Sequence, residues 1–334
     1  MTSLAVPTSE SLLWHHLAHA GFKPSQRIEV LRAAKAHHGE VADLSGWVQA
    51  GFPGVAPAIQ TTLEQALEAS VIEGFLLQDL AFQGMKVLTG RDQDYPKRFK
   101  QTLKDKTPIV LYVSGNAVAL NARRTIAIVG SRDAGEAALE VVTRAAQYFA
   151  AEQYVLVSGN ARGIDQQAEE AALAAGGQVV SVLPQGLLDK STSALIRQRN
   201  RALLDGQIVL LSELHPKSRW QGRFAMMRNR LIMALADVVL VAQTGSKSSV
   251  VGGKKMSSGT WAGAEDAQKL GKRIFVLDLP IEGNQALAQH IAQPLAITAD
   301  NSMFHVIEDS LLTPTPTTSA KLPTERQPNL FGSG

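Results

Sequence analysis

The 334-residue sequence contains no cysteine, which excludes several kinds of chemistry at once. Without thiols the chain has no disulfide, no thiolate metal site and no cysteine nucleophile. It also has no apolar run approaching the roughly 20 residues that a membrane-spanning helix needs. Its start lacks the basic and apolar regions of a secretory signal peptide. We therefore expect a soluble protein of a reducing cytoplasm with no membrane partner.

The excess of positive charge is small over the whole sequence but is concentrated in one segment. The net charge is only +3, yet between Asp189 and Arg230 nine basic residues stand against three acidic ones. Such clustering favours a polyanionic partner. A solvated, arginine-rich surface accounts for the same composition equally well.

Residues 1–82 have the apolar spacing of a small helical module. Five of the eight histidines lie here, and His15 and His19 have the i, i+4 spacing of a metal-binding pair. No acidic residue or third histidine follows at a suitable offset. We therefore expect these histidines to face the solvent and expect no metal site.

From residue 83 to 308 the pattern changes to an alternation of strands and helices. After a bridge with two short strands, we expect strands near 125–129, 154–158, 178–183, 207–212, 237–242 and 273–277. We expect helices near 136–152, 165–175, 192–204, 223–236 and 260–270. Strands that are apolar on both faces imply a parallel sheet covered by helices on both sides. The sequence thus predicts an α/β fold with an extended Rossmann-like, doubly wound, mostly parallel sheet, and residues 309–334 predict a disordered tail.

Two turns carry the strongest functional signal. Thr125–Arg132 (TIAIVGSR) and Val155–Asp165 (VLVSGNARGID) are each an apolar strand followed by a small-residue turn with one arginine. Where parallel strands end side by side, such turns bring backbone N–H groups together in an arrangement that binds phosphate. The predicted phosphate-binding residues are Gly130, Ser131, Arg132, Ser158, Gly159, Arg162 and Gly163.

Neither turn matches a known nucleotide-binding sequence. Gly130–Gly135 lacks the Gly-x-Gly-x-x-Gly spacing of dinucleotide-binding proteins and is not followed by Lys-Ser/Thr, and Gly252–Lys255 also fails the P-loop pattern. These departures disfavour NAD, FAD and P-loop nucleotide hydrolysis. We expect no cofactor.

Two further segments extend the predicted site along a strand of nucleic acid. Phe224–Met233 (FAMMRNRLIM) begins a helix on which Arg228 or Arg230 should point toward the groove. The segment from Gln243 to Ser258 is expected to be a mobile basic loop, which suits an extended nucleic-acid strand. These segments add the candidates Arg228, Arg230, Lys254, Lys255, Ser258, Gly259 and Thr260.

These residues resemble those of DprA/Smf, a family of bacterial DNA-processing proteins that bind single-stranded DNA and load RecA on it. The similarity runs from about residue 10 to 285, and its main signatures are Ile128–Arg132 (IVGSR) and Ser158–Asp165 (SGNARGID). Supporting matches are Asp94–Pro96, Pro108–Gly115, Ser212–Glu213, Phe224, Arg228–Arg230 and Ser258–Thr260. The resemblance implies that residues 1–82 are a SAM-like or helix-hairpin-helix-like module and that a Rossmann-like domain follows. It also implies a homodimer and non-enzymatic binding of single-stranded DNA through its backbone, which would aid recombinase loading or protect the DNA.

The sequence departs from the family pattern at several positions. Asn160 stands where leucine is usual, and Glu169 where histidine is usual. The usual Tyr-Pro pair is missing from Gly186–Ser193, and Ala242 or Gln243 replaces an acid. We expect a divergent member that lacks the family's C-terminal winged-helix-like domain.

The end of the chain suggests a protein partner. Gln327–Phe331 (QPNLF) resembles the short peptide by which bacterial proteins dock on the DNA sliding clamp. Gln327, Leu330 and Phe331 would be its anchors. The other partners that the resemblance implies are single-stranded DNA, a recombinase and a second copy of this chain.

Two alternatives stay open. A divergent member of this family can serve as the antitoxin or sensor subunit of a phage-defence pair that restrains a cognate toxin. Similar folds of the lysine-decarboxylase-like group hydrolyse nucleoside monophosphates, and the acids here that might serve as a general acid and base are Asp165, Glu169, Glu213 and Glu265. Glu265 misses that group's spacing by two positions, and we instead expect Asp165 to cap its helix and Glu169 to face the solvent.

Overall fold

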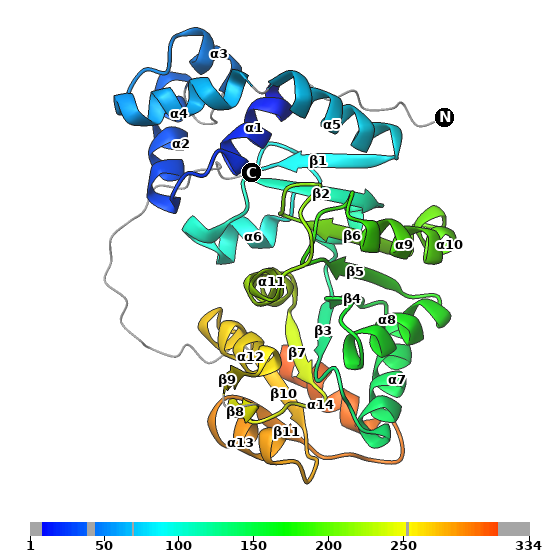
Figure 1. Cartoon of the computed structure of the whole chain (residues 1–334). Coiled ribbons are helices and arrows are strands. Elements are labelled where there is room, and N and C mark those ends of the chain that lie inside the picture. Colours follow the sequence, from blue (N-terminus) through cyan, green and yellow to red (C-terminus); the bar gives the residue numbers. More distant parts are fainter. Residues whose placement is uncertain (1–8, 39–43, 69, 252–253, 313–334) are drawn as a thin grey trace.

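The structure is a computed structural model that describes residues 9–38, 44–68, 70–251 and 254–312 (Figure 1). Among these residues, five helices precede the first strand: α1 (Ser9–His19), α2 (Pro24–His38), α3 (Leu44–Gln49), α4 (Pro57–Glu68) and α5 (Ser70–Phe82). Trp14, Leu17 and Trp47 are buried in the core that these helices share. Within the described ranges, no helix is both long and apolar enough to cross a membrane.

The histidines of this helical region do not all face the solvent, which corrects the prediction. His15 is 1% exposed and His16 is 6% exposed. The reason is that α1 packs against the first two strands of the sheet and also against α3, α4 and α5, so more than one side of it is covered. His15 Nδ1 lies 2.6 Å and His19 Nε2 2.9 Å from the hydroxyl of Tyr112, which is itself buried.

A nine-stranded sheet runs through the rest of the molecule in the order β1-β2-β6-β5-β4-β3-β7-β10-β11. Its strands are β1 (Met85–Thr89), β2 (Val110–Gly115), β3 (Thr125–Val129), β4 (Val155–Ser158), β5 (Gln178–Val182), β6 (Ile208–Ser212), β7 (Val238–Val241), β10 (Arg273–Leu277) and β11 (Gln293–Leu295). At one edge, β1 pairs with β2 and β2 pairs with β6 in antiparallel fashion, and the other pairs of this sheet are parallel. The predicted doubly wound, mostly parallel α/β fold is confirmed.

Helices cover both faces of this sheet (Figure 1). Successive residues of a strand point to opposite faces, so Ile126 joins one core and Ala127 the other. The first core includes α7 (Glu136–Ala151), α8 (Ile164–Ala174) and α14 (Ser302–Leu312). The second includes α6 (Lys97–Thr102), α11 (Gly222–Leu235) and α12 (Gly259–Lys269).

Several elements differ from the sequence-based expectation. The helix expected over 192–204 divides into α9 (Lys190–Gln198) and α10 (Asn200–Leu204). The expected mobile loop contains an antiparallel pair, β8 (Ser248–Val251) with β9 (Lys254–Ser257). α13 (Glu282–His290) was not expected, and α14 continues to Leu312, across the expected start of the tail at 309.

Candidate nucleic-acid interface

The candidate site lies where the direction of strand succession reverses. From β3 the chain adds β4, β5 and β6 on one side, and then β7 on the other side of β3. In open parallel sheets, ligands bind in the crevice beyond the carboxyl ends of the strands at such a point. The Ser131 N–H donates to the Gln243 carbonyl at 2.8 Å, which joins the turn after β3 to the one after β7.

The turns after β3 and β4 are in close contact, and together they form what we call the shelf (residues 130–135 and 159–163). Gly163 has a φ of +85°, which favours glycine. A Cβ atom there would lie 2.5 Å from the Ser131 carbonyl oxygen. The Ile164 N–H donates to the same oxygen at 3.2 Å. The two predicted signatures are therefore brought together.

The arginines of the shelf are exposed. The Arg162 guanidinium lies 2.5 Å from Asp133, but these side chains are 72% and 83% exposed, so solvent screens their attraction. The Arg132 side chain is also exposed, and its guanidinium carbon lies 5.7 Å from the ring centroid of Trp220. Both guanidiniums are therefore accessible to an anion.

Trp220 is a residue that the sequence analysis missed. Its side chain is 50% exposed beside Arg132, on the segment that leads into α11. The available signal was a lone tryptophan within the basic segment between Lys217 and Arg230. An exposed aromatic ring beside cationic groups is typical of surfaces on which nucleic-acid bases stack.

The backbone N–H groups of the shelf are less available than the sequence suggested. Those of Gly135 and Asn160 donate to the side chains of Gln243 and Glu169, each at 2.9 Å. Ser158 is fully buried, so its hydroxyl lies beneath the surface. The exposed guanidiniums, rather than the backbone, are therefore the main anion-binding groups of the shelf.

Arg228 lies beneath the shelf rather than on it. Its side chain is 6% exposed and donates a hydrogen bond to the Gly159 carbonyl at 2.9 Å. A Cβ atom on Gly159 would lie 1.4 Å from the Arg228 guanidinium, so only glycine leaves room for it. The Asp165 carboxylate lies 3.9 Å from the Arg228 guanidinium. Burial raises the pKa of Asp165, while the charge of Arg228 and the N–H groups of the turns act to lower it.

Arg230, two positions further along α11, also has a protein partner. Its guanidinium forms two hydrogen bonds with the Glu213 carboxylate, at 2.6 and 2.5 Å. The expectation that one of these two arginines points into an open groove is thus not met. Each is held by a carboxylate, and Arg228 supports the shelf from below.

Glu169 is buried, which corrects the prediction that it faces the solvent. It accepts hydrogen bonds from the backbone and side-chain amides of Asn160 and from the Ser181 hydroxyl. Burial, reinforced by the nearby charge of Asp165, raises the pKa of Glu169 to about 7. A carboxyl group with no exposed surface cannot contact a substrate on the shelf.

The start of α12 adjoins the shelf through the segment after β7. Ser258 caps α12, because its hydroxyl accepts from the Trp261 N–H at 3.2 Å, and it lies 3.2 Å from the Thr244 hydroxyl. Gly259 is exposed and Thr260 is half-buried in the first turn. Lys254 and Lys255 lie in β9. The proposed clamp-binding residues Gln327, Leu330 and Phe331 lie outside the described part of the chain.

The fold and its two arginine-bearing turns define a Rossmann-like protein whose cationic groups lie at the ligand-binding edge of the sheet. The profile of the DNA recombination-mediator protein A family matches residues 86–306, and the chain belongs to this family. This is the DprA/Smf family that the sequence resembles, and its members include a DNA processing protein DprA and a protein Smf.

Similar proteins support the assignment. The DNA processing protein DprA of Bacillus subtilis is 27% identical over 235 residues, which cover 66% of this chain and 73% of that protein. DprA of Streptococcus pneumoniae is 31% identical over 173 residues, 51% of this chain and 55% of that one. The structure of the latter matches this fold with a TM-score of 0.68 at 24% identity, covering 89% of this chain and 97% of that chain.

A second solved structure concerns DNA binding directly. It is DNA processing protein A of Helicobacter pylori, described for its single-stranded DNA binding mode. It matches with a TM-score of 0.53 at 26% identity, and the match covers 67% of this chain and 96% of that chain.

Proposed function

We propose that this protein is a DNA-processing protein that binds single-stranded DNA through its phosphate backbone, with Arg132 and Arg162 as the main contacts. The observation that carries the proposal is the exposure of both guanidiniums on adjacent turns at the switch point of the sheet. Arginine matches phosphate oxygens with paired hydrogen bonds. The single-stranded DNA binding described for the H. pylori relative supports the same reading.

Trp220 gives the proposed site a preference for single strands. In a duplex the bases are paired and stacked, whereas a single strand can place a base on an exposed ring. The ring of Trp220 lies next to Arg132, so one nucleotide can contact both through its base and its phosphate. Since every base has a flat face, this binding depends little on sequence.

The proposed path continues from the shelf to the start of α12. Thr244 and Ser258 join the end of β7 to the N-terminus of α12. A helix N-terminus favours an anion, and Gly259 allows the strand to approach it. Lys254 and Lys255 of β9 are the proposed contacts beyond it.

Fluorescence anisotropy with labelled single- and double-stranded oligonucleotides across a salt series tests this function. We expect tighter binding of the single strand and an affinity that falls steeply with salt. Arg132→Ala and Arg162→Ala should each reduce the slope of log affinity against log salt by about one phosphate contact.

Arg201→Ala is a matched control for Arg162→Ala. Arg201 is also an exposed arginine paired with a neighbouring aspartate, Asp205 at 2.7 Å, but it lies on α10. We expect it to bind DNA as the wild type does. Equal losses in all three variants would show that general positive charge, and not the shelf, accounts for binding.

Homodimerisation and recombinase loading extend this proposal on the basis of the family resemblance, and sliding-clamp docking extends it on the basis of the tail peptide Gln327–Phe331 (QPNLF). Light scattering of the purified chain tests the dimer. Assembly of a recombinase filament on coated single strands tests loading. Capture by immobilised clamp protein, compared between wild type and Leu330→Ala, tests docking.

The two alternatives gain no support from the described residues. Of the four acids named for hydrolysis, Asp165 and Glu169 are buried, Glu213 is bound to Arg230, and Glu265 is 2.7 Å from Lys247. No contact described above favours an antitoxin role over DNA binding.

A further inference from the structure

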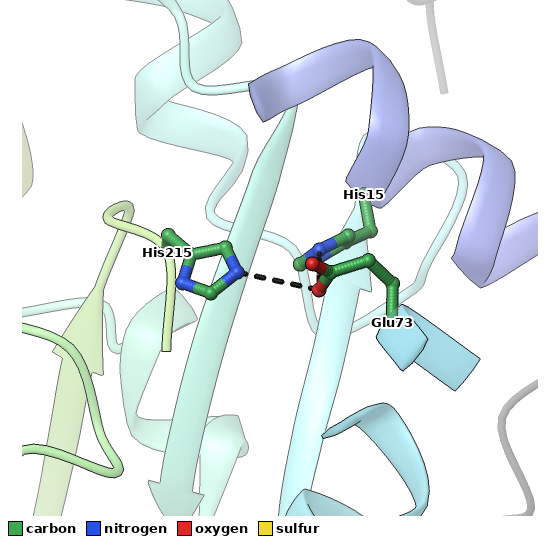
Figure 2. Close-up of side chains that lie close together, drawn as sticks. All are labelled: His15, Glu73 and His215. Atoms are coloured by element: carbon green, nitrogen blue, oxygen red, sulfur yellow. Dashed lines mark hydrogen bonds and ion pairs between the residues drawn. The ribbon is translucent and has the colours of Figure 1, made fainter. Parts of the chain in front are cut away.

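Three side chains with metal-binding atoms meet between the helical region and the sheet (Figure 2). They are His15 of α1, Glu73 of α5 and His215 of the segment after β6. His15 Nε2 lies 2.9 Å and His215 Nε2 lies 3.3 Å from the same Glu73 oxygen. All the ligand atoms lie within 4.8 Å of one another.

We propose that His15, Glu73 and His215 bind a divalent transition-metal ion, for which Zn²⁺ is the best match. Zinc bonds of about 2.0–2.1 Å to nitrogen and oxygen place neighbouring ligands of a tetrahedron roughly 3.3 Å apart. The two measured separations from Glu73, 2.9 and 3.3 Å, are close to that edge. Two imidazoles and a carboxylate form one of the ligand sets that zinc uses, with water in the fourth position.

A second layer of contacts orients the His15 ring. Its other nitrogen, Nδ1, lies 2.6 Å from the Tyr112 hydroxyl, which lies 2.9 Å from His19 Nε2. When Nδ1–H of His15 donates to Tyr112 and Tyr112 donates to His19, the Nε2 lone pair of His15 is free for the metal. Metal-binding histidines commonly have such a partner on the opposite ring nitrogen.

The protonation states fit the same role. A histidine that binds a metal ion must be neutral, with its one ring proton on the nitrogen that does not face the ion. Without an ion, the Nε2–H groups of both histidines donate to Glu73. On binding, each ring keeps one proton, on Nδ1. In His215, Nδ1 accepts a long hydrogen bond of 3.3 Å from the Lys217 N–H when no ion is bound. Once Nδ1 carries the proton, this bond is lost and Nδ1–H donates to water instead.

The site is accessible and would join distant parts of the chain. The Glu73 and His215 side chains are 24% and 29% exposed, so an ion and its water can enter. Glu73 and His215 are 142 positions apart in the sequence. The ion would therefore fasten α1 and α5 to the α/β domain, and its binding to the folded state alone stabilises the fold.

Zinc titration of the full, tag-free chain tests the proposal, after chelator treatment and desalting. With a competing chromogenic indicator we expect one tightly bound Zn²⁺ per chain and a rise in melting temperature. Glu73→Gln and His215→Ala should weaken binding at least tenfold and abolish the rise. Co²⁺ should give the strong visible absorption of tetrahedral coordination in the wild type only.

His290→Ala controls for adventitious binding, because His290 is an exposed histidine at the end of α13. It should bind zinc as the wild type does. Melting curves without metal show whether Glu73→Gln and His215→Ala are folded. Wild-type affinity and spectra in both folded variants, or equal losses in all three, would overturn the proposal.

Discussion

Asn160 and Glu169 are joined by two hydrogen bonds of 2.9 Å, one from the backbone N–H and one from the side-chain amide of Asn160. They are also two of the positions at which the resemblance to DprA/Smf implies a different residue, leucine in place of Asn160 and histidine in place of Glu169. Asn160 has a φ of +53°, a left-handed conformation that asparagine tolerates better than most residues. Asn160 and Glu169 are therefore directly coupled in the structure.

The buried Glu169 should make stability depend on pH. Its pKa is raised from 4.5 to about 7, so it favours the folded state most below pH 4.5, and this contribution is lost as the pH rises through 7. At about 1.4 kcal/mol per unit, the free energy of unfolding should fall by roughly 3 kcal/mol between pH 4.5 and 8. Urea unfolding at several pH values measures this.

Glu169→Gln isolates this contribution from the other titrating groups. Glutamine stays neutral at every pH and keeps an acceptor for the Asn160 N–H, so the variant should lose this part of the pH dependence. If wild type and variant lose stability in parallel, Glu169 does not titrate as its burial implies.

The coupling of the two positions can be measured with a double-mutant cycle. Asn160→Leu leaves the buried Glu169 without one of its donors and should cost about 1–3 kcal/mol. Glu169→His alone should also destabilise the fold. The double variant, which has the family's usual pair, should lose less than the sum of the two by about 0.5–3 kcal/mol. Strict additivity in urea unfolding would contradict the coupling.

Much of the fold could be predicted because its signals are local. β3 and β4 are short, buried and mostly aliphatic, and small-residue turns follow them, so the strands, the turns and their adjacency were recognisable. The unexpected α13 and β11 follow the last predicted strand, where the pattern is weaker: β11 has three residues and only Leu295 is buried.

Contacts between distant residues could not be predicted in this way. The burial of Glu169 depends on Ser181 of the next strand, and that of Arg228 on the Gly159 carbonyl and Asp165. The sequence analysis noted His15 as a residue of a type that binds metals, but its partner Glu73 lies 58 positions away in the sequence. Such pairs have no characteristic spacing in the sequence, because tertiary packing alone brings them together.

Arg228 should be important for stability, in contrast to the exposed Arg162. Arg228→Ala leaves the buried Asp165 without its counter-charge, a change that typically costs 3–5 kcal/mol. Arg162→Ala removes a solvent-exposed ion pair and should cost at most about 1 kcal/mol. Urea unfolding of both variants compares them, and adding Asp165→Asn should restore part of the Arg228→Ala loss. Similar costs for the two arginines would show that Arg228 is not the buried support of the shelf.

Trp220 should contribute to affinity without contributing to salt dependence. Trp220→Ala removes a stacking surface and should weaken binding of single strands by about 1–3 kcal/mol. The side chain is uncharged and releases no counter-ion, so the salt slope should stay at the wild-type value, while Arg132→Ala reduces it. Trp220→Phe should retain most of the affinity.

Phe82→Ala is the matched control for Trp220→Ala, since Phe82 is an aromatic residue 77% exposed at the end of α5. It should leave the anisotropy titration unchanged. A Trp220→Ala variant that binds as tightly as the wild type, or a Phe82→Ala variant that is equally weak, would show that the ring beside Arg132 does not stack on a base. Binding by the arginines alone would then lose the preference for single strands, because a duplex presents the same phosphates.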